Sequence, residues 1–94
     1  MVFDISQVTG IGDYTKKSEK DRTFYQKNGK TFLVINKHTI ELRTDGELKT
    51  LLINKYESVM ESRYFGRGGI EIVPAGQLNK DELDDLVRLS YNLS

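Results

Sequence analysis

The chain contains no cysteine and no tryptophan, and its 94 residues include one proline and one histidine. Without cysteine there is no disulfide, no thiolate nucleophile and no cysteine-ligated zinc site, and a reducing compartment fits this composition. No apolar run approaches the roughly 18 residues of a membrane helix, and the amino-terminal MVFDISQVTG lacks the basic start of a signal peptide. We therefore expect a cytoplasmic protein that does not associate with a membrane.

An excess of one charge is also missing, because 14 Lys and Arg balance 14 Asp and Glu. The basic residues gather in positions 1–37 and the acidic residues in positions 70–94. A dedicated nucleic-acid-binding protein usually has a basic excess, so composition alone does not favour that class. Apolar residues make up 37% of the chain, which is enough for one core, and we expect a single domain over residues 1–94.

Alternating apolar residues between turn signals indicate three consecutive strands in the middle of the chain. Residues 28–29, Asn-Gly, separate RTFYQ from TFLVIN, and this pair favours a type I′ turn because both of its residues tolerate positive φ. Residues 36–38 form a second turn before TIELR, in which Ile40 and Leu42 alternate with Glu41. The pattern predicts an antiparallel meander with one apolar face and one solvent face.

A helix is expected from Thr44 to about Ser62. Thr44 and Glu47 have the spacing of a capping box, and apolar residues then recur at helical intervals. The following GGIEIV predicts a fourth strand with Glu71 facing solvent, and Pro74 is expected to end it because proline cannot donate to a strand ladder.

A second capping box, Asn79 with Glu82, predicts the start of a carboxy-terminal helix. Residues 1–21 show no clear pattern, and we expect a partly flexible segment in which 15–21, TKKSEKD, form a polar loop. The predicted order is β-β-β-α-β-α, an α+β fold with an antiparallel sheet of about four strands and two helices packed on one face. The side chains expected to be largely buried are Leu33, Ile35, Ile40, Leu42, Leu48, Leu52, Val59, Ile70, Ile72, Leu83 and Val87.

The glycine-rich stretch RYFGRGGIEIV, residues 63–73, allows more than one interpretation. A phosphate-binding P-loop is excluded, because that motif leads from a strand into a helix and ends in Lys-Ser or Lys-Thr. One interpretation is a turn, in which at least one glycine has positive φ. The other is an exposed loop that presents Arg63 and Arg67 with Tyr64 and Phe65 beside them.

Residues with catalytic potential do not form a recognisable constellation. His38 has no neighbouring metal-ligand spacing, and the acidic residues at 81–85 are explained by the positive end of a helix. We therefore expect no catalytic residue, no metal site and no cofactor, and the function predicted is a non-catalytic binding module. Nucleic acid is one candidate partner, with a protein partner, or a small ligand or substrate in a polar pocket, as alternatives. The candidate nucleic-acid contacts are Lys16, Lys17, Lys20, Arg63 and Arg67, and the candidate protein anchors are Tyr64 and Phe65.

Three stretches carry a family resemblance: NGKTFLVI, then TIELRTDGELKTLL, then GGIEIV followed by DELDDLVRLSYNL. From about Phe24 to the end, this arrangement resembles the small MmcQ/YjbR-like domains and the short "luciferase domain" proteins. The resemblance implies an α+β domain that binds DNA through two wings, and it brings no catalytic residues. The chain departs from both families near Ile70, where they tend to carry a tryptophan.

Overall fold

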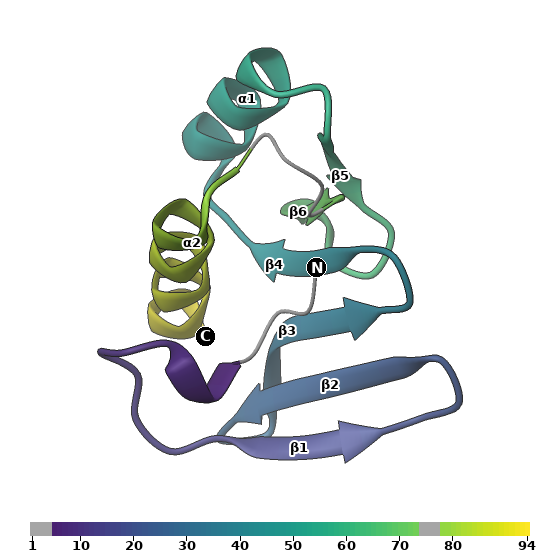
Figure 1. The fold of residues 1–94 in the computed structure, drawn as a ribbon, viewed down its shortest axis with the longest axis vertical. Coiled ribbons are helices and arrows are strands. Elements are labelled where there is room, and N and C mark those ends of the chain that lie inside the picture. Colours follow the sequence, from purple (N-terminus) through teal and green to yellow (C-terminus); the bar gives the residue numbers. More distant parts are fainter. Residues whose placement is uncertain (1–4, 74–77) are drawn as a thin grey trace.

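The computed structural model of the chain describes residues 5–73 and 78–94, and it is an α+β fold built on one antiparallel sheet (Figure 1). The sheet has six strands in the order β1-β2-β3-β4-β6-β5. No helix within these two ranges is long and apolar enough to cross a membrane. In chain order the elements are η1 (Ile5–Gln7), β1 (Thr15–Ser18), β2 (Arg22–Lys27), β3 (Lys30–Asn36), β4 (Ile40–Arg43), α1 (Gly46–Lys55), β5 (Val59–Ser62), β6 (Gly66–Ile72) and α2 (Lys80–Leu93).

The predicted meander is confirmed as strands β2, β3 and β4. Between β2 and β3, Asn28 and Gly29 have φ of 51° and 81°, as a type I′ turn requires. Leu33 on β3 lies opposite Leu42 on β4, and Leu42 lies opposite Ile70 on β6. The three side chains therefore share one face of the sheet, and all of them are buried.

The expected sheet of about four strands is wrong, because one further strand lies at each edge. β1 occupies part of the stretch expected to be a loop, and it pairs with β2 although all four of its residues are exposed. Its pairing comes from backbone hydrogen bonds, which leave no apolar pattern in the sequence. The charged side chains of Lys16 and Lys17 are typical of an edge strand, because they discourage pairing with another chain.

The second extra strand replaces the end of the expected first helix. α1 stops at Lys55 instead of continuing to Ser62, and residues 59–62 return as β5, paired with β6. Val59 is buried as expected, but it lies opposite Ile72 in the sheet. Helical and strand spacing both place Val59 inward, so the sequence pattern could not separate them over so short a stretch.

The two helix starts give different outcomes. The capping box at Asn79 and Glu82 is confirmed, whereas the one expected at Thr44 is wrong. Asp45 caps α1 instead, and its side chain accepts a hydrogen bond of 2.8 Å from the backbone N–H of Leu48. Thr44 is buried, and its hydroxyl has no hydrogen-bond partner among the described residues. Pro74, expected to end β6, lies outside the described residues.

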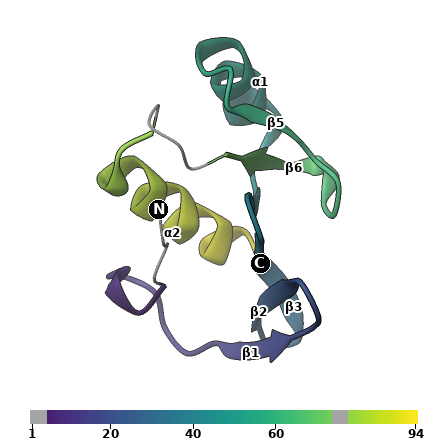
Figure 2. The ribbon, with the colours of Figure 1, turned by 45° about the vertical axis from the view of Figure 1, so that its right-hand side comes forward.

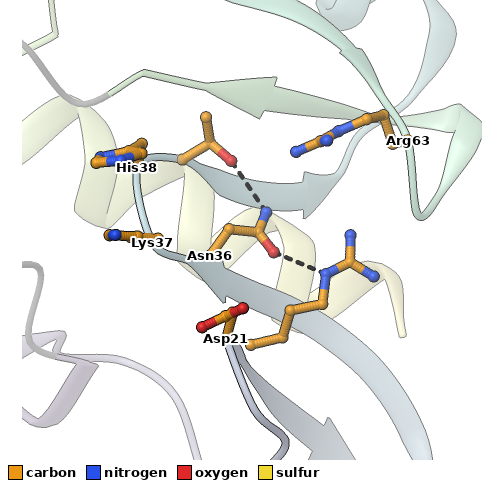
Figure 3. Close-up of a pocket in the computed structure, with 7 residues that line it drawn as sticks. Asp21, Asn36, Lys37, His38 and Arg63 are labelled. Atoms are coloured by element: carbon orange, nitrogen blue, oxygen red, sulfur yellow. Dashed lines mark hydrogen bonds between the residues drawn. The ribbon is translucent and has the colours of Figure 1, made fainter.

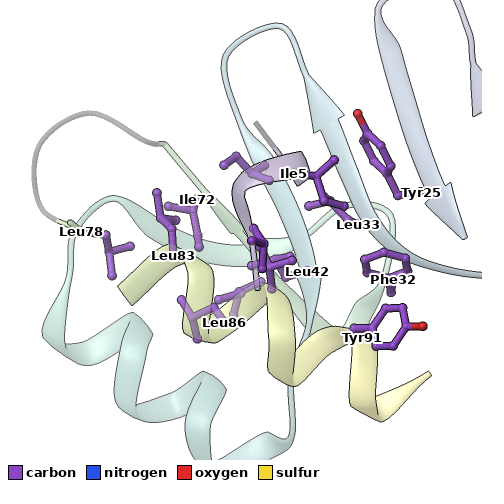
Figure 4. Close-up of a cluster of buried hydrophobic side chains, with 14 of the residues drawn as sticks. Ile5, Tyr25, Phe32, Leu33, Leu42, Ile72, Leu78, Leu83, Leu86 and Tyr91 are labelled. Atoms are coloured by element: carbon purple, nitrogen blue, oxygen red, sulfur yellow. The ribbon is translucent and has the colours of Figure 1, made fainter. Parts of the chain in front are cut away.

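The apolar core lies on one face of the sheet, between the strands and α2 (Figure 4). In Figure 2, α2 lies to the left of the strands, and the turn between β5 and β6 projects to the right. α1 contributes Leu52 to the same core, and the amino-terminal segment contributes Ile5 and Val8. Of the side chains expected to be buried, Ile35 and Leu48 are half-buried and the others are buried. Mobility of residues 1–21 stays a prediction.

One buried serine joins α2 to the sheet. The hydroxyl of Ser90, which is fully buried, donates a hydrogen bond to the carbonyl of Phe32 on β3. The same oxygen accepts a bond of 2.8 Å from the backbone N–H of Arg43 on β4. The carboxy-terminal helix is therefore fixed to two central strands by a polar contact as well as by apolar packing.

Two glycines of the 63–73 stretch have definite structural roles. Gly66 has φ of 60°, which confirms the expected positive φ, and Gly69 passes very close to its neighbours. A Cβ atom on Gly69 would lie 2.4 Å from the carbonyl oxygen of Leu42 and 2.6 Å from the Cβ of Phe65. A Cβ on Gly68 would meet nothing closer than 3.7 Å. Only glycine fits at position 69.

We expect Gly69→Ala to lower the free energy of unfolding by roughly 2 kcal/mol or more, because the backbone of β4 or β6 must shift to admit the methyl group. Gly68→Ala is the matched control, one residue away in the same strand, and it should be nearly neutral. Urea denaturation of the two variants measures the difference. Equal losses of stability would contradict the close approach.

Candidate functional site

Two glutamates lie opposite each other on the face of the sheet away from the core. Glu41 on β4 is paired with Glu71 on β6, and the residues are 0% and 1% exposed. The expectation that they face solvent is wrong, because residues 62–64 of the β5–β6 hairpin bind them and close over them. This part of the second face is therefore covered and not a wet surface, and the buried Val34 lies beside the glutamates.

Glu41 fastens the turn to the sheet. One carboxylate oxygen accepts bonds from the Ser62 hydroxyl at 2.7 Å and the backbone N–H of Tyr64 at 2.8 Å. The other accepts from the Asn36 amide at 2.8 Å and from Nη2 of Arg22 at 3.4 Å. Nε of Arg22 also donates to the Asn36 side chain at 2.9 Å. This buried carboxylate is thus fully hydrogen-bonded, and it orients one arginine.

Glu71 orients a second arginine. Nε and Nη2 of Arg63 donate to its two oxygens at 3.0 and 2.7 Å, and the Thr39 hydroxyl donates at 2.7 Å. The Arg63 guanidinium, together with the Thr39 hydroxyl, holds the pKa of Glu71 below its ordinary value, although burial acts in the opposite direction. Most of the Arg63 side chain remains in solvent, with 70% of it exposed.

The two arginines border one hollow of about 450 Å³, shown in Figure 3. It lies where the β1–β2 turn and the β3–β4 turn come together, because Arg22 lies opposite Asn36 in the sheet. In Figure 3, Arg63 extends over the hollow from one side, and His38 and Lys37 border the opposite side. The lining residues are Asp21, Arg22, Asn36, Lys37, His38, Thr39 and Arg63.

Formal charges around this hollow balance. Arg22, Lys37 and Arg63 supply the positive charge, and the exposed Asp21 and the two buried glutamates supply the negative charge. The hollow therefore offers directed N–H donors more than a strong positive field. Such a site suits a compact group with several acceptor oxygens better than an extended polyanion.

The five cations predicted to contact nucleic acid do not form one surface. Arg63 borders the hollow, Lys20 precedes the hollow residue Asp21, and Lys17 belongs to the same face of the sheet through its pairing with Phe24. The other two lie elsewhere. Lys16 is paired with Tyr25 and belongs to the core face, and Arg67 lies beside α1, where its carbonyl accepts a bond from Lys49.

The two predicted protein anchors differ in exposure. Tyr64 is 45% exposed, and its ring packs against Phe24 and Phe65 with centroid distances of 5.4 and 5.0 Å. Phe65 is half-buried, and the guanidinium of Arg43 lies 5.0 Å from its ring centre. Only Tyr64 is therefore well placed to contact a partner.

Sequence analysis missed most residues of the hollow. Arg22 and Asn36 are at strand ends, and residues 37–39 connect β3 to β4, so only their arrangement in the folded sheet brings them together. The sequence held one signal for the hollow. The loop before RTFYQ and the turn at 36–38 flank two consecutive antiparallel strands, which places both at the same end of the sheet. In the part of the chain that the structure describes, no group of three or more His, Cys, Asp or Glu could hold a metal ion.

Comparison of the chain with models of known protein families, with curated proteins and with solved structures gives no match. The resemblance to MmcQ/YjbR-like domains accordingly stays a prediction.

We expect Arg63→Gln to raise the pKa of Glu71, because it removes the cation that stabilises the carboxylate. A carboxyl-carbon NMR titration measures this shift, and Arg67→Gln is the control that should leave Glu71 unchanged. An unchanged midpoint in Arg63→Gln would show that the ion pair does not set this pKa.

The same shift predicts how stability depends on pH. Since the folded pKa of Glu71 lies below its unfolded value, its contribution is fully present above the unfolded value, 4.5, and is lost as pH falls through the folded pKa. Arg63→Gln should therefore lose less stability on acidification than the original chain, as measured by thermal unfolding across pH 6 to 3.

Proposed function

We propose that the protein is a non-catalytic binding module that holds a compact oxoanion, such as a phosphate group, in the hollow bordered by Arg22 and Arg63. One observation carries the proposal: the hollow is lined by two guanidinium groups, each fixed from behind by a buried glutamate.

A cytoplasmic location and an MmcQ/YjbR-like identity belong to the same proposal. The absence of cysteine supports the first, and the motifs quoted above support the second.

The arginines have donors left for a ligand. Their hydrogen bonds to the described residues use Nε and Nη2, which leaves Nη1 of Arg22 and Arg63 outside these contacts. A guanidinium presents planar donors that match phosphate or carboxylate oxygens. The arginine side chains are already held in place. A ligand therefore does not have to order them, and this reduces the entropic cost of binding.

The same contacts support a non-catalytic role. Glu71 is a poor general base, since Arg63 lowers its pKa and occupies both of its oxygens. The Thr39 hydroxyl donates its hydrogen to this carboxylate, so it is already used in a contact within the sheet. These two groups are thus engaged in holding Arg63 and the sheet together, which supports a binding role.

Nucleic acid and small phosphate-bearing molecules share the chemistry that this hollow would bind. The two buried glutamates do not present free negative charge to a nucleic-acid backbone, because they are covered and paired with arginines. The separation of Lys16 and Arg67 from the other three cations still argues against a broad duplex-binding surface. A protein-interaction role is the second candidate, favoured by the exposure of Tyr64.

An amide NMR titration of the whole chain with sodium phosphate tests the proposal, with sodium chloride at matched ionic strength as reference. We expect phosphate-specific shifts at residues 22, 36–39 and 63, with a Kd on the order of 1 mM, because the charges of the hollow balance. Pyrophosphate and a short single-stranded oligonucleotide form the other arms, and they separate a small-molecule source of phosphate from a strand.

Lys37→Ala and Lys30→Ala are the matched variants. Both lysines are exposed, Lys30 as the first residue of β3 and Lys37 as the residue after it, but only Lys37 borders the hollow. We expect Lys37→Ala to weaken phosphate binding several-fold and Lys30→Ala to leave it unchanged. Equal effects of the two substitutions, or phosphate shifts no larger than those with chloride, would exclude the hollow as an oxoanion site.

A further inference from the structure

Tyr64 is an exposed aromatic side chain that packs on two other rings and directly follows Arg63 of the hollow. Its ring contacts those of Phe24 and Phe65, and its hydroxyl lies 3.4 Å from the Thr31 hydroxyl. Its backbone N–H is bonded to the buried Glu41. Even so, 45% of the residue is exposed. An aromatic side chain that is already ordered gives up little rotamer entropy when a second ring stacks on it.

The ring and the hollow are neighbours along two elements. Arg63, which borders the hollow, directly precedes Tyr64 in the β5–β6 turn. Arg22, which also borders the hollow, belongs to the same face of β2 as Phe24, two residues away or about 6.6 Å along the strand. The Tyr64 ring packs on Phe24, so it lies on the same face of the sheet as the hollow, about two residues of β2 away from Arg22. That spacing is on the scale of one nucleotide.

We propose that the ligand is a nucleotide unit, whose phosphate binds in the hollow and whose base stacks on Tyr64. This inference rests on the oxoanion site proposed above and adds the chemical class of the ligand. Base stacking on aromatic side chains is tolerant of sequence, because every base has a π face. The structure therefore assigns Tyr64 as the residue that distinguishes a nucleotide from a bare phosphate.

A protein partner fits this face less well. Among the described residues, the exposed large apolar side chains on it are Tyr64 and Met60, which is opposite Glu71 in the sheet. That is little apolar area for the centre of a protein interface. A single fixed aromatic ring next to oriented arginines is instead the combination that binds a base and its phosphate.

Adenosine monophosphate and ribose 5-phosphate form the decisive ligand pair, because they differ by the base alone. With the whole chain, NMR titration should give AMP a Kd at least about five-fold lower than that of ribose 5-phosphate. Only AMP should shift the ring signals of Tyr64. A single-stranded trinucleotide is the third ligand. If it binds more tightly than AMP, the natural ligand is a strand, and if it does not, the ligand is a free nucleotide.

Two substitutions at Tyr64 isolate the ring. Tyr64→Ala should bring AMP to the affinity of ribose 5-phosphate without changing the latter, and Tyr64→Phe should keep the difference. Both variants retain the backbone N–H that bonds Glu41. Their amide spectra show whether the fold is kept, and the ligand comparison on the unaltered chain remains decisive if Tyr64→Ala does not fold.

The outcomes separate this inference from the proposed function. If phosphate and ribose 5-phosphate bind but AMP binds no more tightly, the nucleotide inference is overturned and the oxoanion site stands. If none of the three binds, both fail. A phosphoserine peptide that binds as tightly as AMP, with Tyr64→Ala weakening both equally, would overturn the nucleotide in favour of a protein ligand.

Discussion

The second face of the sheet depends on two carboxylates that are buried opposite each other on neighbouring strands. Like charges at this spacing repel, and each would lose its hydration, so the arrangement is stable only if donors and cations surround it. Glu41 and Glu71 meet this requirement through the β5–β6 hairpin and through Arg22 and Arg63. The two buried charges are thus compensated by groups of the hairpin and by the two arginines. These contacts hold the hairpin against the sheet and place both arginines at the rim of the hollow.

The glycine-rich stretch, residues 63–73, makes this closure possible. Gly66 supplies a left-handed residue, and Gly69 lets the backbone of β6 pass against the carbonyl of Leu42 and the side chain of Phe65. Phe65 can then support the ring of Tyr64, and Ser62 can reach Glu41. The glycine turn and the exposed segment, the two interpretations of this stretch, are therefore compatible. The backbone geometry that glycine permits places Arg63 and Tyr64 at the surface.

Local signals predicted the elements whose structure is decided locally. The Asn28-Gly29 turn, the inward Ile40 and Leu42, and the Asn79 capping box all follow from short sequence patterns. The edge strands β1 and β5 could not be predicted in this way, because long-range backbone pairing decides them. Burial of Glu41 and Glu71 was missed because alternation marks which face a side chain takes and does not show whether another segment covers that face. Most of the hollow was missed for the same reason.

The most direct test of the central claim observes the arginine side chains themselves. Nε–Hε signals of the protein, followed by NMR during a phosphate titration, should shift for Arg22 and Arg63 with one common Kd. Those of Arg67 and Arg88, which lie outside the hollow, should remain in place. Shifts of similar size at all four arginines, or none at Arg22 and Arg63, would contradict an oxoanion site built on the two buried glutamates.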